Sequence, residues 1–199
     1  MESLLRDIFL EKKNSMIKKS IVSIFALIFC VISCSKDSDD NSIGFLSEND
    51  KVLSLKVHND ARAEVGVPNL EWSDKLAQDA LNWAKVMAEQ EEMFHSSNES
   101  RPGQGENLYY WCCSTGEIET FSSTPGTDAS VLWYNEISDY TYAVIGSPLN
   151  ADVMIGHYTQ IIWSTTTEVG IAKWKSASGK MFVAARYSPP GNVIGQFPY

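Results

Sequence analysis

Residues 156–166, Gly-His-Tyr-Thr-Gln-Ile-Ile-Trp-Ser-Thr-Thr, combine an ionisable side chain with residues that need burial. At helical spacing, Tyr158, Ile161 and Ile162 form one apolar face, and His157 and Gln160 lie at its border. This pattern predicts a short helix docked on a core, with an imidazole near its first turn. A single His beside an apolar face is more often a hydrogen-bonded packing residue than a ligand or a base. His157 gains a functional role only if other ionisable groups converge on it.

Three longer helices are predicted outside this stretch. Their signals are a capping residue at the start, apolar residues at helical spacing and, for the first helix, Gly and Pro after the last turn. They begin after Ser47, after Ser73 and at Thr127, and the first two end before Gly66 and near Glu92. Residues 138–155 have little periodicity and are predicted to form a long surface loop.

Three segments have the composition of β-strands. They are residues 106–111, 169–175 and 181–186, and a short turn that ends at Gly179 joins the last two as a hairpin. Residues 69–72 are predicted to be a short extended connector. Gly105 precedes the first strand and would let the backbone approach another element closely, because glycine has no side chain.

Two acidic residues stand out in this pattern. Glu136 shares the inward side of the third predicted helix with Leu132 and Trp133. An inward carboxylate costs several kcal/mol unless it is paired, protonated or bound to metal, so Glu136 requires a partner. Glu106 is the first residue of the first predicted strand and directly follows Gly105.

The amino-terminal residues are predicted to be an export signal. Met16 starts a basic segment, and residues 21–32 form an apolar run that is broken only by Ser23. This run is too short to span a bilayer as a mature helix. Residues 1–33 are therefore assigned to the signal, with residues 1–15 as an over-long start.

Cys34 follows Val-Ile-Ser, a sequence that resembles the lipobox of bacterial lipoproteins. In that class the cysteine is lipidated and the signal is cut just before it, so Cys34 would attach the exported protein to a membrane of the bacterial cell envelope. Residues 34–47 are predicted to be the lipidated cysteine and a flexible, acidic tether. The alternative is a simple cleaved signal in which Cys34 has no role.

The composition is that of one globular domain with a tail, because 44% of the residues are hydrophobic. The chain carries 16 Lys and Arg against 25 Asp and Glu, a formal charge of −9 at pH 7. Phosphate binding needs clustered basic residues, so this balance argues against nucleic acid as a partner. The sequence gives no indication of the oligomeric state.

Residues 50–199 resemble the CAP superfamily, the group of cysteine-rich secretory proteins, venom allergens and plant pathogenesis-related proteins. Residues 156–166 are similar to the first signature of this family and residues 182–193 to the second, and residues 195–199 resemble the usual end of the domain. Earlier landmarks also match in order, at residues 58–62, 70–72, 105–108 and 133–136. The resemblance implies an α+β fold over residues 48–199, a three-layer α-β-α sandwich with an antiparallel central sheet.

The resemblance also implies a central cavity lined by two His and two Glu, which correspond to His95, Glu106, Glu136 and His157. Such a set could bind zinc or another divalent cation, with His95 and His157 as ligands. The same four residues could instead hold one another by hydrogen bonds without metal. No family disulfide is expected, since Ala185 stands at a cysteine position. Adjacent Cys112 and Cys113 could form a strained disulfide or remain thiols, and a structural or incidental role is favoured.

Two classes of function follow. The favoured one is a binding or interaction module for an apolar lipid or a protein partner, because the chain has none of the Gly-x-Ser-x-Gly, Ser-x-x-Lys or His-Glu-x-x-His motifs. The alternative is a metal-assisted hydrolase of peptides, in which Glu106 or Glu136 acts as the general base on a metal-bound water. A serine hydrolase that uses His157 is a weaker third hypothesis.

Overall fold

The computed structural model describes residues 44–112 and 122–199, and the statements below concern these residues. By its contacts the chain divides into the units Met1–Asn41 and Ser42–Tyr199, and the second unit contains every element described here. The predicted signal, Cys34, most of the tether and Cys113 lie outside the described residues. Within the described residues, no helix has the length and apolar character needed to cross a membrane.

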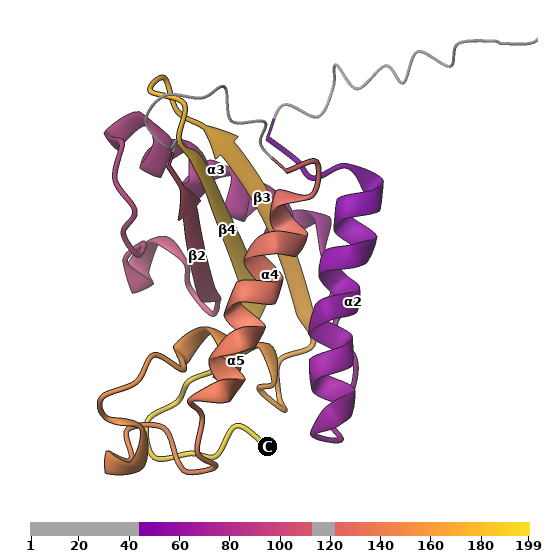
Figure 1. The fold of residues 1–199 in the computed structure, drawn as a ribbon, viewed down its shortest axis with the longest axis vertical. Helices are drawn as coiled ribbons and strands as arrows, with labels where there is room; N and C mark the ends of the chain where they lie inside the picture. Colours follow the sequence, from indigo (N-terminus) through magenta and orange to yellow (C-terminus); the bar gives the residue numbers. More distant parts are fainter. Residues whose placement is uncertain (1–43, 113–121) are drawn as a thin grey trace, which may run out of the picture. The chain divides into compact units, whose positions relative to one another are not determined.

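The described unit is a sheet between two layers of helices (Figure 1). Its four strands are β1 (Glu71–Trp72), β2 (Gly105–Trp111), β3 (Glu168–Lys175) and β4 (Met181–Ser188), in the order β1-β3-β4-β2. Helix α3 (Asp74–Gln90) covers one face of the sheet. Helices α2 (Glu48–Glu64), α4 (Pro125–Asn135) and α5 (Gly156–Ile161) cover the other face. The predicted three-layer sandwich is confirmed.

The sheet is largely antiparallel, as predicted, with one parallel pair at its β1 edge. Strands β2, β3 and β4 form antiparallel pairs, whereas β1 pairs parallel to β3 through Glu71 and Trp72. The sequence predicts an extended connector at these positions. The long crossover between β1 and β3, which contains α3, β2, α4 and α5, is what allows two parallel strands to lie side by side.

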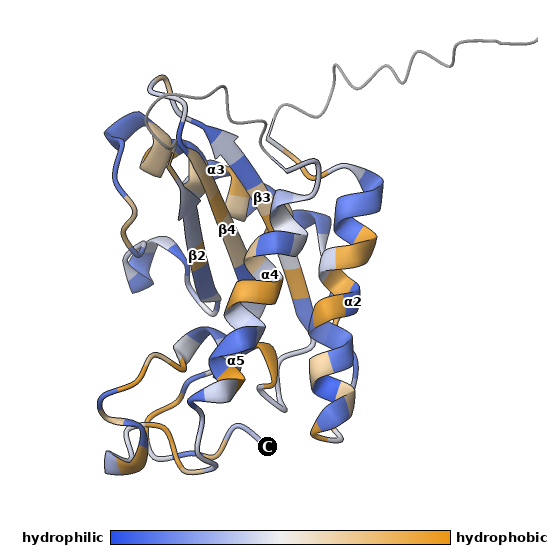
Figure 2. Ribbon diagram, viewed as in Figure 1, coloured by the Kyte–Doolittle hydropathy of each residue, from blue (hydrophilic) through white to orange (hydrophobic). Residues whose placement is uncertain are grey.

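Successive side chains of β4 point to opposite faces of the sheet and belong to two separate hydrophobic cores. Val183, Ala185 and Tyr187 pack with α2, α4 and α5, whereas Phe182 and Ala184 pack with α3. Figure 2 shows the apolar residues that run along β3 and β4 between the helical layers. This assignment of faces fixes on which side of the sheet each candidate side chain lies.

Gly170 in β3 brings α3 close to the sheet. A Cβ atom at this position would lie 2.1 Å from the backbone nitrogen of Ala77 in α3. The contact is with backbone atoms that cannot rotate away, so only glycine fits without displacing the helix. The apolar stripe predicted for α3, which includes Leu76, Ala80 and Met87, is buried beneath it.

Helix α2 contradicts the apolar pattern from which it is predicted. Val52 is 56% exposed, and the buried face consists largely of polar residues: Asp50, Ser54, His58 and Arg62. The carboxylate of Asp50 accepts hydrogen bonds from the backbone N–H groups of Gly126 and Thr127, 3.0 and 2.8 Å away. These are amides of the first turn of α4, so α2 supplies the cap for α4.

Helix α4 differs from its prediction in two ways. It begins at Pro125, two residues before the expected start, because Asp50 holds its first turn. Leu132, which is predicted on the buried side, is 45% exposed, whereas Trp133 is 2% exposed. Glu136 lies just beyond the helix, in the 3₁₀ turn η2 (Glu136–Ser138). The predicted surface loop contains another such turn, η3 (Pro148–Asn150), and η1 (Asn98–Ser100) lies between α3 and β2.

Candidate functional site

Glu106 is the centre of a dense polar cluster at the start of β2. Its side chain is 1% exposed. One carboxylate oxygen accepts hydrogen bonds from Nδ1 of His95 at 2.7 Å and from the backbone N–H of Ser96 at 3.0 Å. The other accepts from the Ser96 hydroxyl at 2.8 Å and lies 2.9 Å from Nη1 of Arg186. Glu106 is therefore saturated with donors.

The charge of Glu106 is stabilised by these contacts. Burial alone would raise the pKa of Glu106, but the hydrogen bond from His95, the charge of Arg186 and the two bonds from Ser96 together lower it below its ordinary value. Glu106 is therefore ionised at neutral pH. Because a carboxylate can only accept, Nδ1 of His95 carries the hydrogen in this contact.

Glu136 and His157 form a second pair of the same kind. Nδ1 of His157 lies 2.6 Å from one oxygen of Glu136. The other oxygen accepts hydrogen bonds from the backbone N–H groups of His157 and Tyr158, at 2.9 and 3.0 Å. These are amides of the first turn of α5, so Glu136 caps the helix that carries His157. His157 is therefore the partner that the partly buried carboxylate of Glu136 requires.

The two pairs lie towards opposite faces of the edge strand β2. Glu106 shares a face of β2 with Leu108, which packs in the α3 core. Asn107 therefore points to the other face, where its Nδ2 donates to the carbonyl oxygen of His157 at 3.1 Å. The described residues contain no group of three or more His, Cys, Asp or Glu that could hold one metal ion. A shared metal site for all four residues stays a prediction.

A cavity of about 500 Å³ opens beside the first pair. His95, Glu106, Gln160 and Asn192 are among its lining residues. Gln160 is buried and accepts a hydrogen bond from the backbone N–H of Gly191 at 2.9 Å. A Cβ at Gly105 would lie 2.1 Å from the same Gln160 oxygen. The absence of a side chain at Gly105 therefore makes room for the Gln160 side chain, which is the close approach expected at this glycine.

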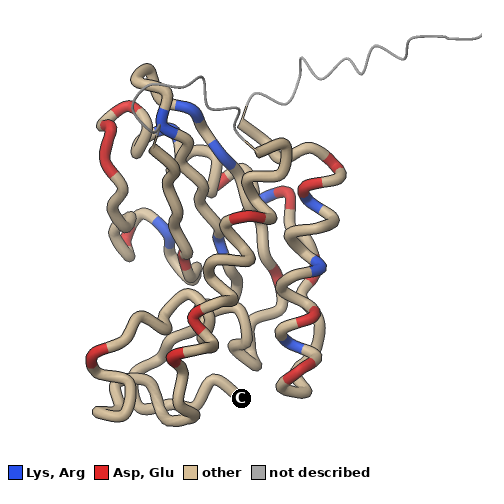
Figure 3. The backbone as a smooth tube through the Cα atoms, in the orientation of Figure 1, with Lys and Arg blue, Asp and Glu red and all other residues tan. Residues whose placement is uncertain are grey.

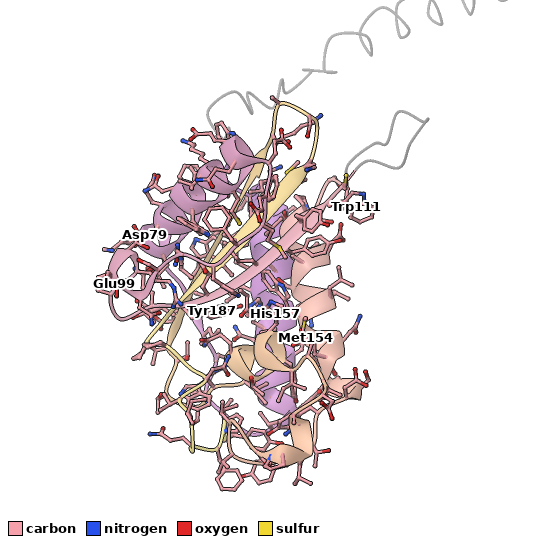
Figure 4. The ribbon with its side chains drawn as sticks, turned by 90° about the vertical axis from the view of Figure 1, so that its left-hand side faces the viewer. Asp79, Glu99, Trp111, Met154, His157 and Tyr187 are labelled. Atoms are coloured by element: carbon pink, nitrogen blue, oxygen red, sulfur yellow. The ribbon has the colours of Figure 1, made fainter. Side chains whose placement is uncertain are left out.

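A buried hydrogen bond joins His58 to Tyr187, and the hydrophobic pattern of the sequence does not predict it. Nδ1 of His58 donates to the carbonyl oxygen of Ser54 at 2.8 Å, so Nε2 accepts from the Tyr187 hydroxyl, also at 2.8 Å. Asn107 donates both to that hydroxyl and to the carbonyl of His157. Figure 4 labels Tyr187 and His157 in this region. Burial, together with the charge of Arg62, lowers the pKa of His58 to about 4.

Arg62 ties the first signature to α2. Its guanidinium is buried and donates to four backbone carbonyls, those of Pro68, Ile161, Trp163 and Thr166. Burial lowers the pKa of Arg62 to about 10, so the side chain remains charged at neutral pH. The only sequence signal for this role is the resemblance at residues 58–62, because an amphipathic pattern would place Arg in solvent.

Cys112 lies exposed after the end of β2. Its neighbour Cys113 lies outside the described residues, so the pairing of these two cysteines stays a prediction.

Comparison with known proteins gives a consistent answer. Residues 55–187 match the model of the cysteine-rich secretory protein family, CAP. The chain is similar to pathogenesis-related leaf protein 4 of Solanum lycopersicum, with 35% identity over 73% of this chain and 80% of that protein. It is also similar to the Golgi-associated plant pathogenesis-related protein 1 of Homo sapiens, with 32% identity over 71% and 84%.

Solved structures share the fold. BmVAL-1 superposes with a TM-score of 0.68 at 24% identity, over 78% of this chain and 84% of that chain. NaASP2 with Zn²⁺ gives a TM-score of 0.65 at 24% identity, over 77% and 86%. Sequence and fold agree, and the chain belongs to the cysteine-rich secretory protein (CAP) family.

Proposed function

We propose that this protein is an exported CAP domain, anchored in the bacterial cell envelope through Cys34, that acts as a ligand-binding or interaction module. The ligand enters the cavity of about 500 Å³ beside His95 and Glu106. The module serves binding and not hydrolysis. Its ligand is an apolar lipid or an apolar segment of a protein partner.

The observation that carries this proposal is the saturation of both carboxylates. Glu106 has four donors and Glu136 has three. A general base must reach the proton that it removes with a free lone pair, and its pKa must lie near the working pH. The lowered pKa of Glu106 and its buried contacts with Arg186 and Ser96 favour a fixed structural anion.

The surroundings of the cavity favour an apolar ligand. Val193 lines the cavity and is 41% exposed, and Ile194 next to it is 77% exposed. Met154, labelled near His157 in Figure 4, is 70% exposed. Residues 138–172 and 187–199 contain no Lys or Arg, and Figure 3 shows few charges on these loops. Arg101 also lines the cavity, but it lies 4.0 Å from the Glu106 carboxylate and donates to the backbone carbonyls of Ser96 and Gln104. With this cation already paired, the exposed apolar residues suit lipid or protein better than phosphate.

The test uses the purified, delipidated full-length protein and fluorescent fatty acid and sterol probes. Val193→Asp places a charge at the cavity and should reduce probe retention at least about tenfold. Val131→Asp is the matched control, because Val131 is 40% exposed on α4, and it should bind as the wild type does. Failure of the wild type to retain any probe, or equal losses in both variants, would exclude the lipid-binding module.

The anchor is tested separately by membrane fractionation. Cys34→Ser should move the protein from the membrane pellet to the soluble fraction, because the anchoring acyl chains are lost. A variant that remains in the pellet would contradict lipidation at Cys34, whatever the lipid-probe experiment shows.

Metal binding is the second candidate, supported by the free imidazole nitrogens. His95 and His157 each use Nδ1 for a Glu, and no described residue forms a hydrogen bond with either Nε2. Metal-binding His residues commonly have this arrangement, with one nitrogen on a carboxylate and the other on the ion. A bound divalent ion would lower the pKa of its water, as the peptidase alternative requires.

Titration calorimetry with Zn²⁺, followed by metal analysis, tests this candidate. Wild-type uptake that is lost in His95→Ala plus His157→Ala would support a two-imidazole site completed by water. No uptake, or the same uptake in the double variant, would exclude both the metal site and the peptidase alternative.

A further inference from the structure

Four large apolar side chains lie exposed on the loops beyond α5, and together they form what is here called the aromatic face. They are Tyr142, 51% exposed, Ile194, 77%, Phe197, 50%, and Tyr199, 37%. None of the four is among the residues that line the cavity of about 500 Å³. Figure 1 shows the two segments that carry them, residues 138–155 and 189–199, next to each other below α5.

The two segments hold each other by backbone hydrogen bonds. The N–H of Ile145 donates to the carbonyl oxygen of Gln196 at 2.9 Å, and the N–H of Gly195 donates to the carbonyl oxygen of Ile145, also at 2.9 Å. The N–H of Ser164 donates to the carbonyl oxygen of Pro198 at 2.7 Å, which joins the second segment to the residues after α5. The aromatic face therefore has an ordered backbone, and a partner would not have to order these loops.

The aromatic rings of this face are fixed by one another. The ring centroids of Tyr142 and Phe197 lie 4.9 Å apart, and those of Tyr142 and Tyr199 lie at the same distance. The Tyr142 hydroxyl donates to the carbonyl oxygen of Tyr199 at 2.7 Å. Rings held in one orientation lose little conformational entropy when a partner covers them, and aromatic residues are enriched at protein interfaces. The aromatic face therefore has the properties of a preformed protein-binding surface.

The charges beside the aromatic face have one sign. Residues 138–172 and 187–199 contain no Lys or Arg, and Figure 3 shows acidic positions on these loops. Asp139 and Asp152 are exposed, and neither forms an ion pair with another described residue. Asn150 brings the segment of Asp152 beside Tyr142, because its side chain pairs with the backbone N–H and carbonyl of Thr141 at 2.9 and 2.8 Å. Two carboxylates without a counter-charge therefore lie near the apolar surface.

This combination distinguishes between possible partners. A second copy would bring the same carboxylates against these, and the chain has a formal charge of −9, so like charges oppose self-association. An anionic membrane surface would be repelled for the same reason, because attachment to such membranes depends on Lys and Arg. The complementary partner has basic residues next to its own apolar residues.

We propose that the aromatic face docks a cationic amphipathic segment of another protein. The apolar residues of that segment cover Ile194 and Phe197, which removes exposed hydrocarbon from water. Its Lys or Arg side chains lie against Asp139 and Asp152. This interaction surface is separate from the cavity, so it is independent of any ligand that the cavity binds.

The test measures fluorescence anisotropy with the purified full-length protein in neutral lipid nanodiscs, with empty nanodiscs as the blank. The probe is a labelled helical peptide with Leu and Trp on one side and Lys on the other, and in the matched peptide Glu replaces every Lys. The Lys peptide should bind more weakly as the salt concentration rises, and the Glu peptide should bind at least about tenfold more weakly than the Lys peptide. No binding of the Lys peptide, or equal binding of both peptides, overturns the proposal.

One pair of variants tests the apolar contact. Ile194→Ser should weaken binding of the Lys peptide about tenfold. Leu132→Ser, at a 45% exposed position on α4, is the matched control and should bind as the wild type does. Equal losses in the two variants would show that the peptide does not bind at the aromatic face. Self-association that Ile194→Ser abolishes, without peptide binding, would assign this face to a second copy and would also refute the proposal.

A second pair of variants tests the charge contact. Asp139→Asn plus Asp152→Asn should reduce both the affinity for the Lys peptide and its dependence on salt. Glu89→Gln plus Glu92→Gln removes the same number of exposed charges elsewhere and should change neither. The same loss in both double variants would show a general attraction to an acidic protein, and the docking site would be refuted.

Discussion

The buried His58 predicts how the protein responds to mild acid. Its imidazole is fully buried, and its pKa is about 4 in the folded protein against an ordinary value of 6.5. The unfolded chain takes up this proton near pH 6.5, whereas the folded protein does so only near pH 4. The contribution of His58 to stability is therefore complete above pH 6.5 and is lost as the pH falls towards 4. At about 1.4 kcal/mol for each pKa unit, the loss is about 3 kcal/mol.

Urea unfolding, followed by tryptophan fluorescence at several pH values between 7 and 4, measures this loss. His58→Gln is the comparison, because its amide can still donate to the Ser54 carbonyl and accept from the Tyr187 hydroxyl but does not titrate. Other acid-sensitive groups, such as Glu106, are common to both proteins and cancel in the difference. The wild type should lose about 3 kcal/mol more than the variant. If the free energy of unfolding falls equally with pH in both proteins, the assigned tautomer and burial of His58 are refuted.

Three further predictions concern stability. Arg62→Met leaves four backbone carbonyls without their donor and should lower the free energy of unfolding by about 3–5 kcal/mol in urea titrations; unchanged stability would contradict the bonds. Gly170→Ala, whose Cβ would overlap the backbone of Ala77, should lower the melting temperature and cost about 1–3 kcal/mol, while Gly156→Ala, with more space, is the control. The lowered pKa of Glu106 means that its stabilising charge is lost as the pH falls below 4.5, so Glu106→Gln should flatten the stability curve there, and an unchanged slope would contradict the pairing.

The parts of the fold that could be predicted are those that bury hydrocarbon. The α3 stripe with Leu76, Ala80 and Met87 leaves a helical repeat in the sequence, whereas β4, which is buried on both faces, leaves a continuous run rich in apolar and β-prone residues. The bounds of α2 could be predicted from Ser47 and Gly66, but its buried face could not, because it is filled by ions and hydrogen-bonding groups such as Asp50 and Arg62. Their burial depends on carbonyls and amides from distant segments, which a local pattern cannot contain.

The candidate site likewise contains residues that the sequence pattern indicates and residues that it does not. Glu136 could be singled out because a carboxylate on an apolar side requires a partner, and His157 because of its place beside Tyr158 and Ile161. Which imidazole meets which carboxylate depends on the alternation of β2, which places Glu106 and Asn107 on opposite faces. Gln160 and Arg186 were missed as site residues, since their role depends on Gly191 and Glu106, which lie far from them in the chain.

The short helix α5 is held at both ends by side chains from other elements. Glu136 binds its first amides, and Arg62 binds the carbonyls of Ile161 and Trp163 at and just beyond its other end, which matches the direction of the helix dipole. A six-residue helix cannot persist alone, so we expect α5 to form late in folding, after α2 and η2 have docked. Its amide hydrogens should therefore exchange with deuterium through local opening, before those of the central strands. The signature that identifies this family would then be among the last segments of the chain to acquire its structure.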